Sequence, residues 1–119
     1  ELYTDWNSDL TIVEGVFDAV VAGNAIPLLG STLHSRSPLI RQIVFNDTPV
    51  YLALDPDAAD KERKIIKTLS SYDIELYKID VSGYEDVGSM TKDVFEERKQ
   101  NARFIDRDNY LLLDLLSAI

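Results

Sequence analysis

The sequence contains no cysteine and a single histidine, His34. Disulfide scaffolds, thiolate catalysis and zinc sites built from cysteine or from several histidines are therefore excluded. No apolar run reaches the roughly 18 residues that span a bilayer, and the start of the chain lacks the basic and apolar pattern of a signal peptide. We therefore expect a soluble, cytoplasmic protein without a membrane partner.

Basic residues are also scarce. The chain has 12 Lys and Arg against 21 Asp and Glu, which gives a net charge of −9. A surface that holds the phosphates of nucleic acid by itself normally carries a surplus of positive charge. The composition therefore argues against a domain that binds nucleic acid alone, although acidic residues can still act on phosphates through a metal ion.

A length of 119 residues, 45% of them hydrophobic, fits one domain with a real core. The chain opens on Glu1 instead of methionine and closes on the apolar segment LLLDLLSAI. We therefore interpret residues 1–119 as a single domain and expect it to be a piece of a longer protein.

Short apolar runs alternate with helix-like stretches along the chain, which is the pattern of an α/β fold. The apolar runs predict strands at residues 10–13, 25–29, 50–54 and 74–79. Helical spacing of apolar positions, together with glycine, proline and acidic residues at the ends, predicts helices at residues 14–23, 37–45, 58–71, 91–103 and about 108–119. Asp108 would cap the last helix, and no fifth strand is expected.

Strands that are separated by helices run parallel with right-handed crossovers. Pro27 lies inside the second predicted strand and cannot donate a ladder hydrogen bond, so this strand belongs at an edge. We therefore expect a four-stranded parallel sheet of order 2-1-3-4, flanked by helices in a Rossmann-like fold. Ligands of such sheets bind at the carboxyl ends of the strands where the winding reverses, here between the first and third strands.

Four acidic residues belong to this crevice. Glu14 directly follows the first predicted strand, and Asp55 directly follows the third. Asp57 comes two residues after Asp55, and Asp18 lies four residues after Glu14 on the first predicted helix. Carboxylates packed this closely repel one another unless a proton or a cation separates them. Because oxygen ligands without cysteine or histidine select a hard ion, we expect Mg²⁺ or Mn²⁺ at this crevice.

The stretch from Asp55 to Asp57 has a second interpretation, which stays open. Asp55 can cap the free N–H groups of the following helix, Pro56 has the φ angle of a first helical position, and Asp57 would meet the positive helix end. In that case the two acids only stabilise the start of a helix.

Three segments in order, VEGVFDA (13–19), LLGS (28–31) and LALDPDA (52–58), resemble the TOPRIM domain of bacterial and phage primases, type IA and type II topoisomerases and several nucleases. The resemblance covers about residues 10–102. It implies a glutamate in acid–base chemistry, which maps onto Glu14, and a metal-holding Asp-x-Asp pair, which maps onto Asp55 and Asp57. For primases it also implies two further acids, Asp18 and Asp86 of YEDVGSM.

The sequence departs from the patterns of the family's branches. Topoisomerases tend to add a third aspartate and an Arg-Glu-Gly-Glu signature, which DPDAADKER lacks. Primases and their phage relatives more often show Asp-x-Asp-x-Ala-Gly, where this chain has Asp60 in place of the glycine. Gly88 stands where a second acid would follow Asp86. These departures leave the number of bound metal ions open.

Phosphate contacts have weaker signals. Gly30 and Ser31 resemble the primase loop after the second strand, whose N–H and hydroxyl groups could meet a phosphate, although an ordinary strand-to-helix turn explains them equally well. Lys61 and Lys64 lie near the start of the third predicted helix, where they would either contact phosphate or form a solvated helix face.

The resemblance implies that the chain is the Mg²⁺-dependent catalytic domain of a DNA primase, of bacteriophage or bacterial type, which transfers nucleotides to make RNA primers for DNA replication. Its partners would be the DNA template and nucleoside triphosphates, bound in the context of the full-length protein, with a replicative helicase as a further candidate partner. The alternative is a TOPRIM-type nuclease or a topoisomerase-related domain that cuts DNA with the same ions. A receiver-like module, which needs a fifth strand ending on lysine, and a non-catalytic binding module are the remaining classes.

Overall fold

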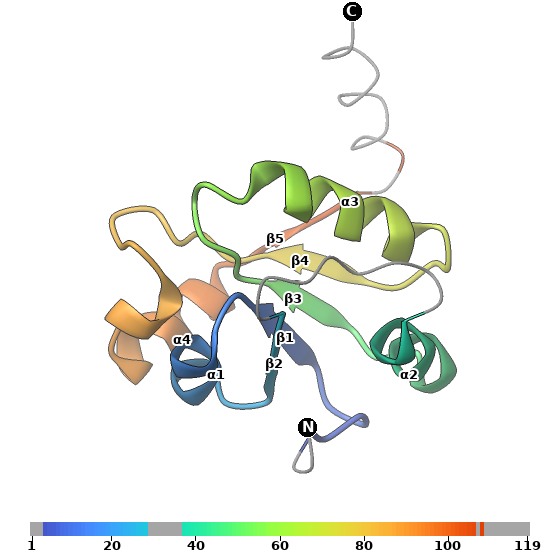
Figure 1. Ribbon diagram of the computed structural model, residues 1–119, viewed down its shortest axis with the longest axis horizontal. Helices are drawn as coiled ribbons and strands as arrows, with labels where there is room; N and C mark the ends of the chain where they lie inside the picture. Colours follow the sequence, from blue (N-terminus) through green and yellow to red (C-terminus); the bar gives the residue numbers. More distant parts are fainter. Residues whose placement is uncertain (1–3, 29–36, 107, 109–119) are drawn as a thin grey trace, which may run out of the picture.

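The computed structural model describes residues 4–28, 37–106 and 108. They form a sheet of short strands with helices packed against it (Figure 1). The strands are β1 (Leu10–Val13), β2 (Ala25–Pro27), β3 (Val50–Leu52), β4 (Leu76–Lys78) and β5 (Arg103–Phe104). The helices are α1 (Val16–Ala22), α2 (Pro38–Asn46), α3 (Ala59–Ser70), α4 (Lys92–Gln100) and the 3₁₀ helix η1 (Val87–Ser89). None of the helices in these described ranges is both long and apolar enough to cross a membrane.

The sheet has the strand order β2-β1-β3-β4-β5. β1 to β4 run parallel and stand in the order expected from the sequence, with Pro27 on the edge strand β2. The α/β class is therefore confirmed. The expectation of four parallel strands is wrong in one respect, because β5 adds a fifth strand that runs antiparallel to β4.

β5 begins at Arg103, the last residue of the predicted helix. The helix predicted for residues 91–103 ends at Gln100, and Arg103 already belongs to the sheet. The ring of Phe104 packs edge-on against the ring of Tyr77 in β4, with centroids 5.5 Å apart. Such cross-strand aromatic contacts are worth more than the helix propensity of a few residues at a frayed end. A strand that ends on Phe104 also differs from the fifth strand ending on lysine that a receiver module needs.

Other predicted elements differ mainly at their ends. β3 and β4 are shorter than the apolar runs at residues 50–54 and 74–79, because the ends of these runs continue into loops. Several predictions fall outside the described residues. These are the last residue of the second predicted strand, the loop residues Gly30 and Ser31, and the predicted C-terminal helix beyond Asp108.

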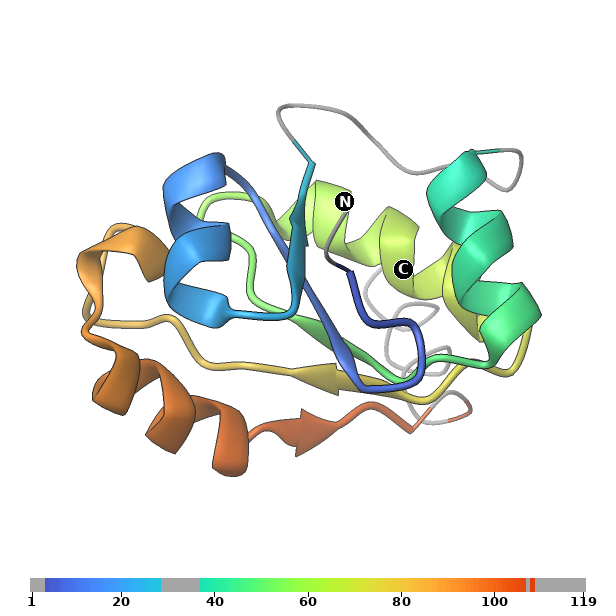
Figure 2. The same ribbon diagram turned by 90° about the horizontal axis from the view of Figure 1, so that it is seen from below.

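Two buried apolar clusters lie on opposite faces of the sheet, because successive residues of each strand alternate between them. One cluster joins Leu10 of β1 with Ile43 of α2 and Ile65 of α3. The other joins Val13 of β1 with Ala22 of α1 and Phe95 of α4. α2 and α3 therefore cover one face, and α1 and α4 cover the other. In Figure 2, α1 and α4 lie together on the left and α2 lies on the right.

Helix ends follow the residues that predict them. The Ser37 hydroxyl accepts a hydrogen bond from the N–H of Ile40 at 3.1 Å, and Pro38 is the first residue of α2. Thr91 caps α4 in the same way. Gly23 ends α1 with φ of 91°, a conformation that favours glycine. These ends fix where each loop begins at the edges of the sheet.

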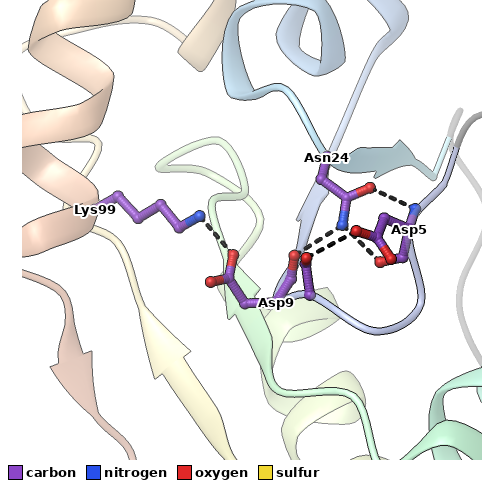
Figure 3. A network of polar contacts seen from close by, with 5 residues as sticks. Asp5, Asp9, Asn24 and Lys99 are labelled. Carbon is purple, nitrogen blue, oxygen red and sulfur yellow. Dashed lines mark hydrogen bonds and ion pairs between the residues drawn. The ribbon is translucent and has the colours of Figure 1, made fainter.

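The segment before β1 is held by Asn24, in the turn between α1 and β2 (Figure 3). Its side-chain amide donates hydrogen bonds to the backbone oxygens of Asp5 and Asp9, and its Oδ1 accepts one from the N–H of Asp5, each at 2.9 Å. Lys99 of α4 forms an ion pair with Asp9. These contacts lie at the amino end of β1, so they stabilise the sheet without entering the acidic edge at its carboxyl end.

We predict that Asn24→Ala lowers the free energy of unfolding by about 1–2 kcal/mol, because a half-buried amide loses its hydrogen bonds. Urea unfolding followed by circular dichroism measures the change. Asn46→Ala is the control, since the Asn46 amide bonds only to Gln42 on its own helix, and it should cost less than about 0.5 kcal/mol. Equal losses for the two variants would contradict the role given to Asn24.

Candidate functional site

Five carboxylates converge at the edge of the sheet where β1 and β3 end. They come from the loop after β1, from α1, from the loop after β3 and from the residue before η1. The negative charges of the other four all act on the central one, Asp55. The five residues are Glu14, Asp18, Asp55, Asp57 and Asp86. The structure therefore brings together every residue for which the sequence predicts a catalytic or metal-binding role.

The surroundings of Asp55 disfavour its ionised form. Its Oδ1 is buried and has no hydrogen-bond partner within the described part of the chain. Burial, and then the neighbouring carboxylates, raise the pKa of Asp55 to about 6. At neutral pH the side chain is therefore mostly ionised in a place that penalises its charge. A cation bound here would relieve that penalty.

Asp18 is buried, with 6% of its surface exposed, and both of its oxygens are engaged. Oδ2 accepts a hydrogen bond from the N–H of Gly15 at 2.9 Å, and Oδ1 accepts one from the N–H of Gly88 at 2.6 Å. The first contact closes the start of α1, and the second ties α1 to η1. Asp18 therefore positions two site loops, a role that the helical spacing from Glu14 does not reveal.

The loop around η1 is shaped by Asp86 and Gly88. The Oδ1 of Asp86 accepts hydrogen bonds from the N–H and the hydroxyl of Ser89, at 2.9 and 2.7 Å. A Cβ atom added at Gly88 would lie 3.0 Å from Oδ1 of Asp18 and 3.5 Å from Oδ1 of Asp86. The glycine that replaces an expected acid therefore leaves room for the hydrogen bond to Asp18, and a side chain here would crowd two carboxylates.

Glu14 forms an ion pair with Lys61 of α3. The Nζ of Lys61 lies 3.1 Å from Oε2 and 3.4 Å from Oε1 of Glu14, and both side chains are partly buried. Lys61 was expected either to contact phosphate or to lie on a solvated helix face, and neither interpretation describes this contact. The ion pair holds the carboxylate of Glu14 in place at the end of β1.

The capping interpretation of Asp55 and Asp57 is not supported. The residue at the N-cap of α3 is Ala58, and the described structure contains no side-chain capping hydrogen bond at this helix start. Asp55 contributes only its backbone oxygen, which accepts from the N–H of Ala58 at 3.0 Å. Asp57 is exposed. Neither carboxylate is therefore placed as a helix cap.

Asp55 and Asp57 also differ from the other three acids in lacking partners. Within residues 4–28, 37–106 and 108, neither carboxylate makes a hydrogen bond or an ion pair. Glu14, Asp18 and Asp86 are each held by Lys61 or by N–H and hydroxyl groups. The Asp-x-Asp pair is thus the part of the cluster with oxygen atoms left to bind a ligand.

The donor chemistry of this pair fits Mg²⁺, which is commonly held by one or two carboxylates while water and substrate phosphates complete its coordination. In the described part of the chain, no three acidic or histidine side chains are placed so that they could hold an ion together. Asp55 and Asp57 would therefore hold the ion, and the remaining ligands would come from outside this group. The edge offers a pair of ligands rather than a closed cage.

A second polar region, which the sequence patterns did not predict, lies beside this edge. A groove of about 290 Å³ is lined by Lys78, Asp80, Asn101 and Arg103, where the end of β4 meets the start of β5. Because the predicted helix extended to Arg103, nothing placed this residue next to Lys78. The available signal was the short run of Phe104 and Ile105, two residue types that favour strands, after the polar end of α4. Lys64, a predicted phosphate contact, is exposed on α3 and lines no part of this groove.

Comparison of the chain with known protein families, with curated proteins and with solved structures found no match. The function proposed below therefore rests on the sequence pattern and on the geometry of the acidic edge.

We predict that Asp55→Asn stabilises the fold at pH 7.5 by about 1–2 kcal/mol, a range reduced for partial solvent screening. In the folded state the pKa of Asp55 is raised from 3.8 to about 6, so ionisation costs stability as the pH rises through this window. The gain should therefore shrink as the pH falls from 6 and vanish near pH 4. Urea unfolding at several pH values measures it.

The matched control for this experiment is Asp57→Asn, which removes an exposed aspartate two residues away. It should change stability far less, because it only weakens one of the repulsions that act on Asp55. A loss of stability in Asp55→Asn at pH 7.5 would show that this carboxylate holds the fold together, contrary to the geometry described.

Proposed function

We propose that this chain is a TOPRIM-like, Mg²⁺-dependent catalytic domain of a DNA primase, which works as part of a longer protein. One observation carries the proposal. Five acids converge at the carboxyl edge of the parallel strands β2-β1-β3-β4, and two of them, Asp55 and Asp57, have side chains without partners among the described residues. These two are the pair that resembles the family's metal-holding motif. The order of strands and the place of the edge agree with ligand binding at a switch point.

Each acid has a separate role in this proposal. Asp55 and Asp57 would hold Mg²⁺, which when bound supplies positive charge to the phosphates of a nucleoside triphosphate and lowers the pKa of an attacking 3′-hydroxyl. Glu14 would accept the proton of that hydroxyl. The ion pair with Lys61 orients the carboxylate of Glu14, which suits a group that must be positioned to accept a proton.

Asp18 and Asp86 would act as positioning residues rather than as direct ligands. Their oxygens accept the N–H groups of Gly15, Gly88 and Ser89, which fixes the loops beside Asp55. The site would then contribute mainly geometry and charge, as is usual for enzymes of phosphoryl transfer.

The partners in this proposal are the DNA template and nucleoside triphosphates, with a replicative helicase as a further candidate. A net charge of −9 makes the chain a poor holder of DNA by itself. Template binding would therefore depend on other parts of the protein. A TOPRIM-type nuclease would use the same acids with water as the nucleophile, and the activity experiment below separates the two.

Metal binding is tested by titrating Mn²⁺ and recording ¹H–¹⁵N spectra. We expect paramagnetic broadening centred on the amides around Asp55 and Asp57, extending to Glu14, because these acids would share the ion's surroundings. Asp55→Asn should weaken the effect by about tenfold or more, the scale of losing a charged ligand. Asp93→Asn, which removes an exposed acid from α4, is the control and should change nothing. Broadening spread evenly over the acidic surface would contradict a defined site.

Catalysis is tested in the full-length protein by primer synthesis on a DNA template. Glu14→Gln, Asp55→Asn and Asp57→Asn should each reduce the rate by about 10²-fold or more, the usual scale for a positioned acid–base or electrostatic group. Higher Mn²⁺ should partly rescue the two aspartate variants, whose defect is ion affinity. It should rescue Glu14→Gln less, because an ion cannot replace a proton acceptor.

Asp93→Asn serves again as the control and should retain full activity. DNA cleavage that requires the same three residues, without primer synthesis, would assign the nuclease branch instead. Full activity of all three variants in both assays would refute a catalytic role for the acidic edge.

A further inference from the structure

The groove at the β4–β5 edge adjoins the acidic site. It is lined by Lys78, Asp80, Asn101 and Arg103 and has a volume of about 290 Å³. A second groove, of about 230 Å³, is lined by Asp55 and Pro56 at one side and by Lys78 and Asp80 at the other. Because Lys78 and Asp80 line both grooves, the two grooves adjoin each other at the end of β4, with Asp55 in the lining of one and Arg103 in the lining of the other.

Two cationic side chains, from β4 and β5, line the groove at the β4–β5 edge. Lys78 of β4 and Arg103 of β5 are direct partners in the antiparallel register, so their side chains lie on the same face of the sheet. Like charges placed directly opposite each other destabilise a strand pair. Neighbouring positions carry the favourable pair of Tyr77 and Phe104 on the other face. The cationic pair is therefore a local cost that an anion between the two side chains would remove.

Of the two cations, Arg103 is the one whose side chain makes no hydrogen bond or ion pair with the described residues, and it is exposed. The Nζ of Lys78 lies 3.0 Å from Oε1 of Glu62 of α3. The guanidinium group of an arginine offers several N–H donors in a planar fork that matches the oxygens of a phosphate. Arg103 is thus placed to bind an oxyanion that also contacts Lys78.

The carboxylate of Asp80 does not block this groove, because it is already engaged. It accepts a hydrogen bond from the N–H of Ser82 at 2.9 Å, and Arg98 lies 3.6 Å from it. The hydrogen bonds from Ser82, and then the charges of Arg98 and Lys78, hold the pKa of Asp80 below its usual range. The charge of Asp80 is therefore offset mainly by Ser82 and Arg98, which lie outside the cationic pair, and in part by Lys78.

We propose that Lys78 and Arg103, with the side-chain amide of Asn101, form a subsite for the phosphate chain of a nucleotide whose reacting phosphate lies at Asp55. Anion binding follows from the cationic pair and the groove alone, whereas the identity of the ligand as a nucleotide rests on the proposed function. A short phosphate chain fits a small groove in a chain of net charge −9. The backbone of a polynucleotide would extend over the acidic surface around it and be repelled.

The first experiment titrates sodium tripolyphosphate into the full chain in EDTA and follows ¹H–¹⁵N spectra, so that no divalent ion contributes. The amides of Lys78, Asn101 and Arg103 should shift in a saturable manner. Arg103→Gln and Lys78→Gln should each weaken binding by about fivefold to tenfold, the scale of one exposed charge-assisted hydrogen bond. Arg41→Gln, which removes an exposed arginine from α2, is the matched control and should leave binding unchanged.

Two further variants exclude a purely structural role for the pair. Glu62→Gln should tighten binding, because it releases Lys78 from its ion pair. Arg103→Gln should leave the melting temperature unchanged or raise it, because it relieves the repulsion from Lys78. Loss of tripolyphosphate binding together with a lowered melting temperature in Arg103→Gln, but not in Lys78→Gln, would overturn the proposal.

The second experiment identifies the ligand class under the same conditions. ATP should shift the same amides as tripolyphosphate, and adenosine should not. Tighter binding of a single-stranded oligonucleotide than of tripolyphosphate would overturn the assignment to a nucleotide. Failure of tripolyphosphate to bind, with intact Mn²⁺ binding at Asp55, would refute the subsite while leaving the proposed function standing. Failure of Mn²⁺ to bind at Asp55, with intact tripolyphosphate binding, would refute the proposed function while leaving the anion subsite standing.

Discussion

Repulsion among carboxylates at one edge of the sheet is the constraint on which the rest of this structure depends. The fold brings five acids to the ends of β1 and β3, and a chain that did so without compensation would lose stability. Three of the acids receive specific compensation. Glu14 pairs with Lys61, while Asp18 and Asp86 accept backbone N–H groups. The side chain of Asp55 has no such partner among the described residues, and its raised pKa reflects this uncompensated repulsion.

The compensation is also what shapes the site. The hydrogen bond from Gly88 to Asp18 joins η1 to α1, and the ion pair of Glu14 joins α3 to the end of β1. These contacts cross between segments that lie far apart in the sequence. The two apolar clusters on the faces of the sheet supply the favourable free energy of folding that offsets the remaining cost. A carboxylate left unpaired inside an otherwise satisfied site is more typical of ligand binding than of structural support.

The parts of the fold that the sequence predicted depend on local signals. Pro27 places β2 at an edge, the apolar runs mark β1, β3 and β4, and parallel crossovers then leave few possible orders. The meeting of Glu14 with Asp55 follows from that order. The unpredicted parts depend on contacts between distant residues. Lys61 lies 47 residues from Glu14, and Gly88 lies 70 from Asp18. No periodicity in one sequence reports such pairs, and β5 depends likewise on the cross-strand contact of Phe104 with Tyr77.

Charge is distributed along the carboxyl edge in a way that suits one kind of ligand. At one end lies an acidic pair without internal partners, Asp55 and Asp57, and at the other lies a cationic pair, Lys78 and Arg103. The acidic end alone would attract a cation, and the cationic end alone would attract an anion. A phosphate chain that carries its own divalent ion satisfies both, because the ion meets the acids while the outer phosphate oxygens meet the cations. The same arrangement disfavours free phosphate at the acidic end, since without the ion it would face uncompensated carboxylates. If both proposed sites act on one ligand, the order of charges along this sheet edge should make a phosphate chain that carries a divalent ion bind more tightly than the same chain without the ion.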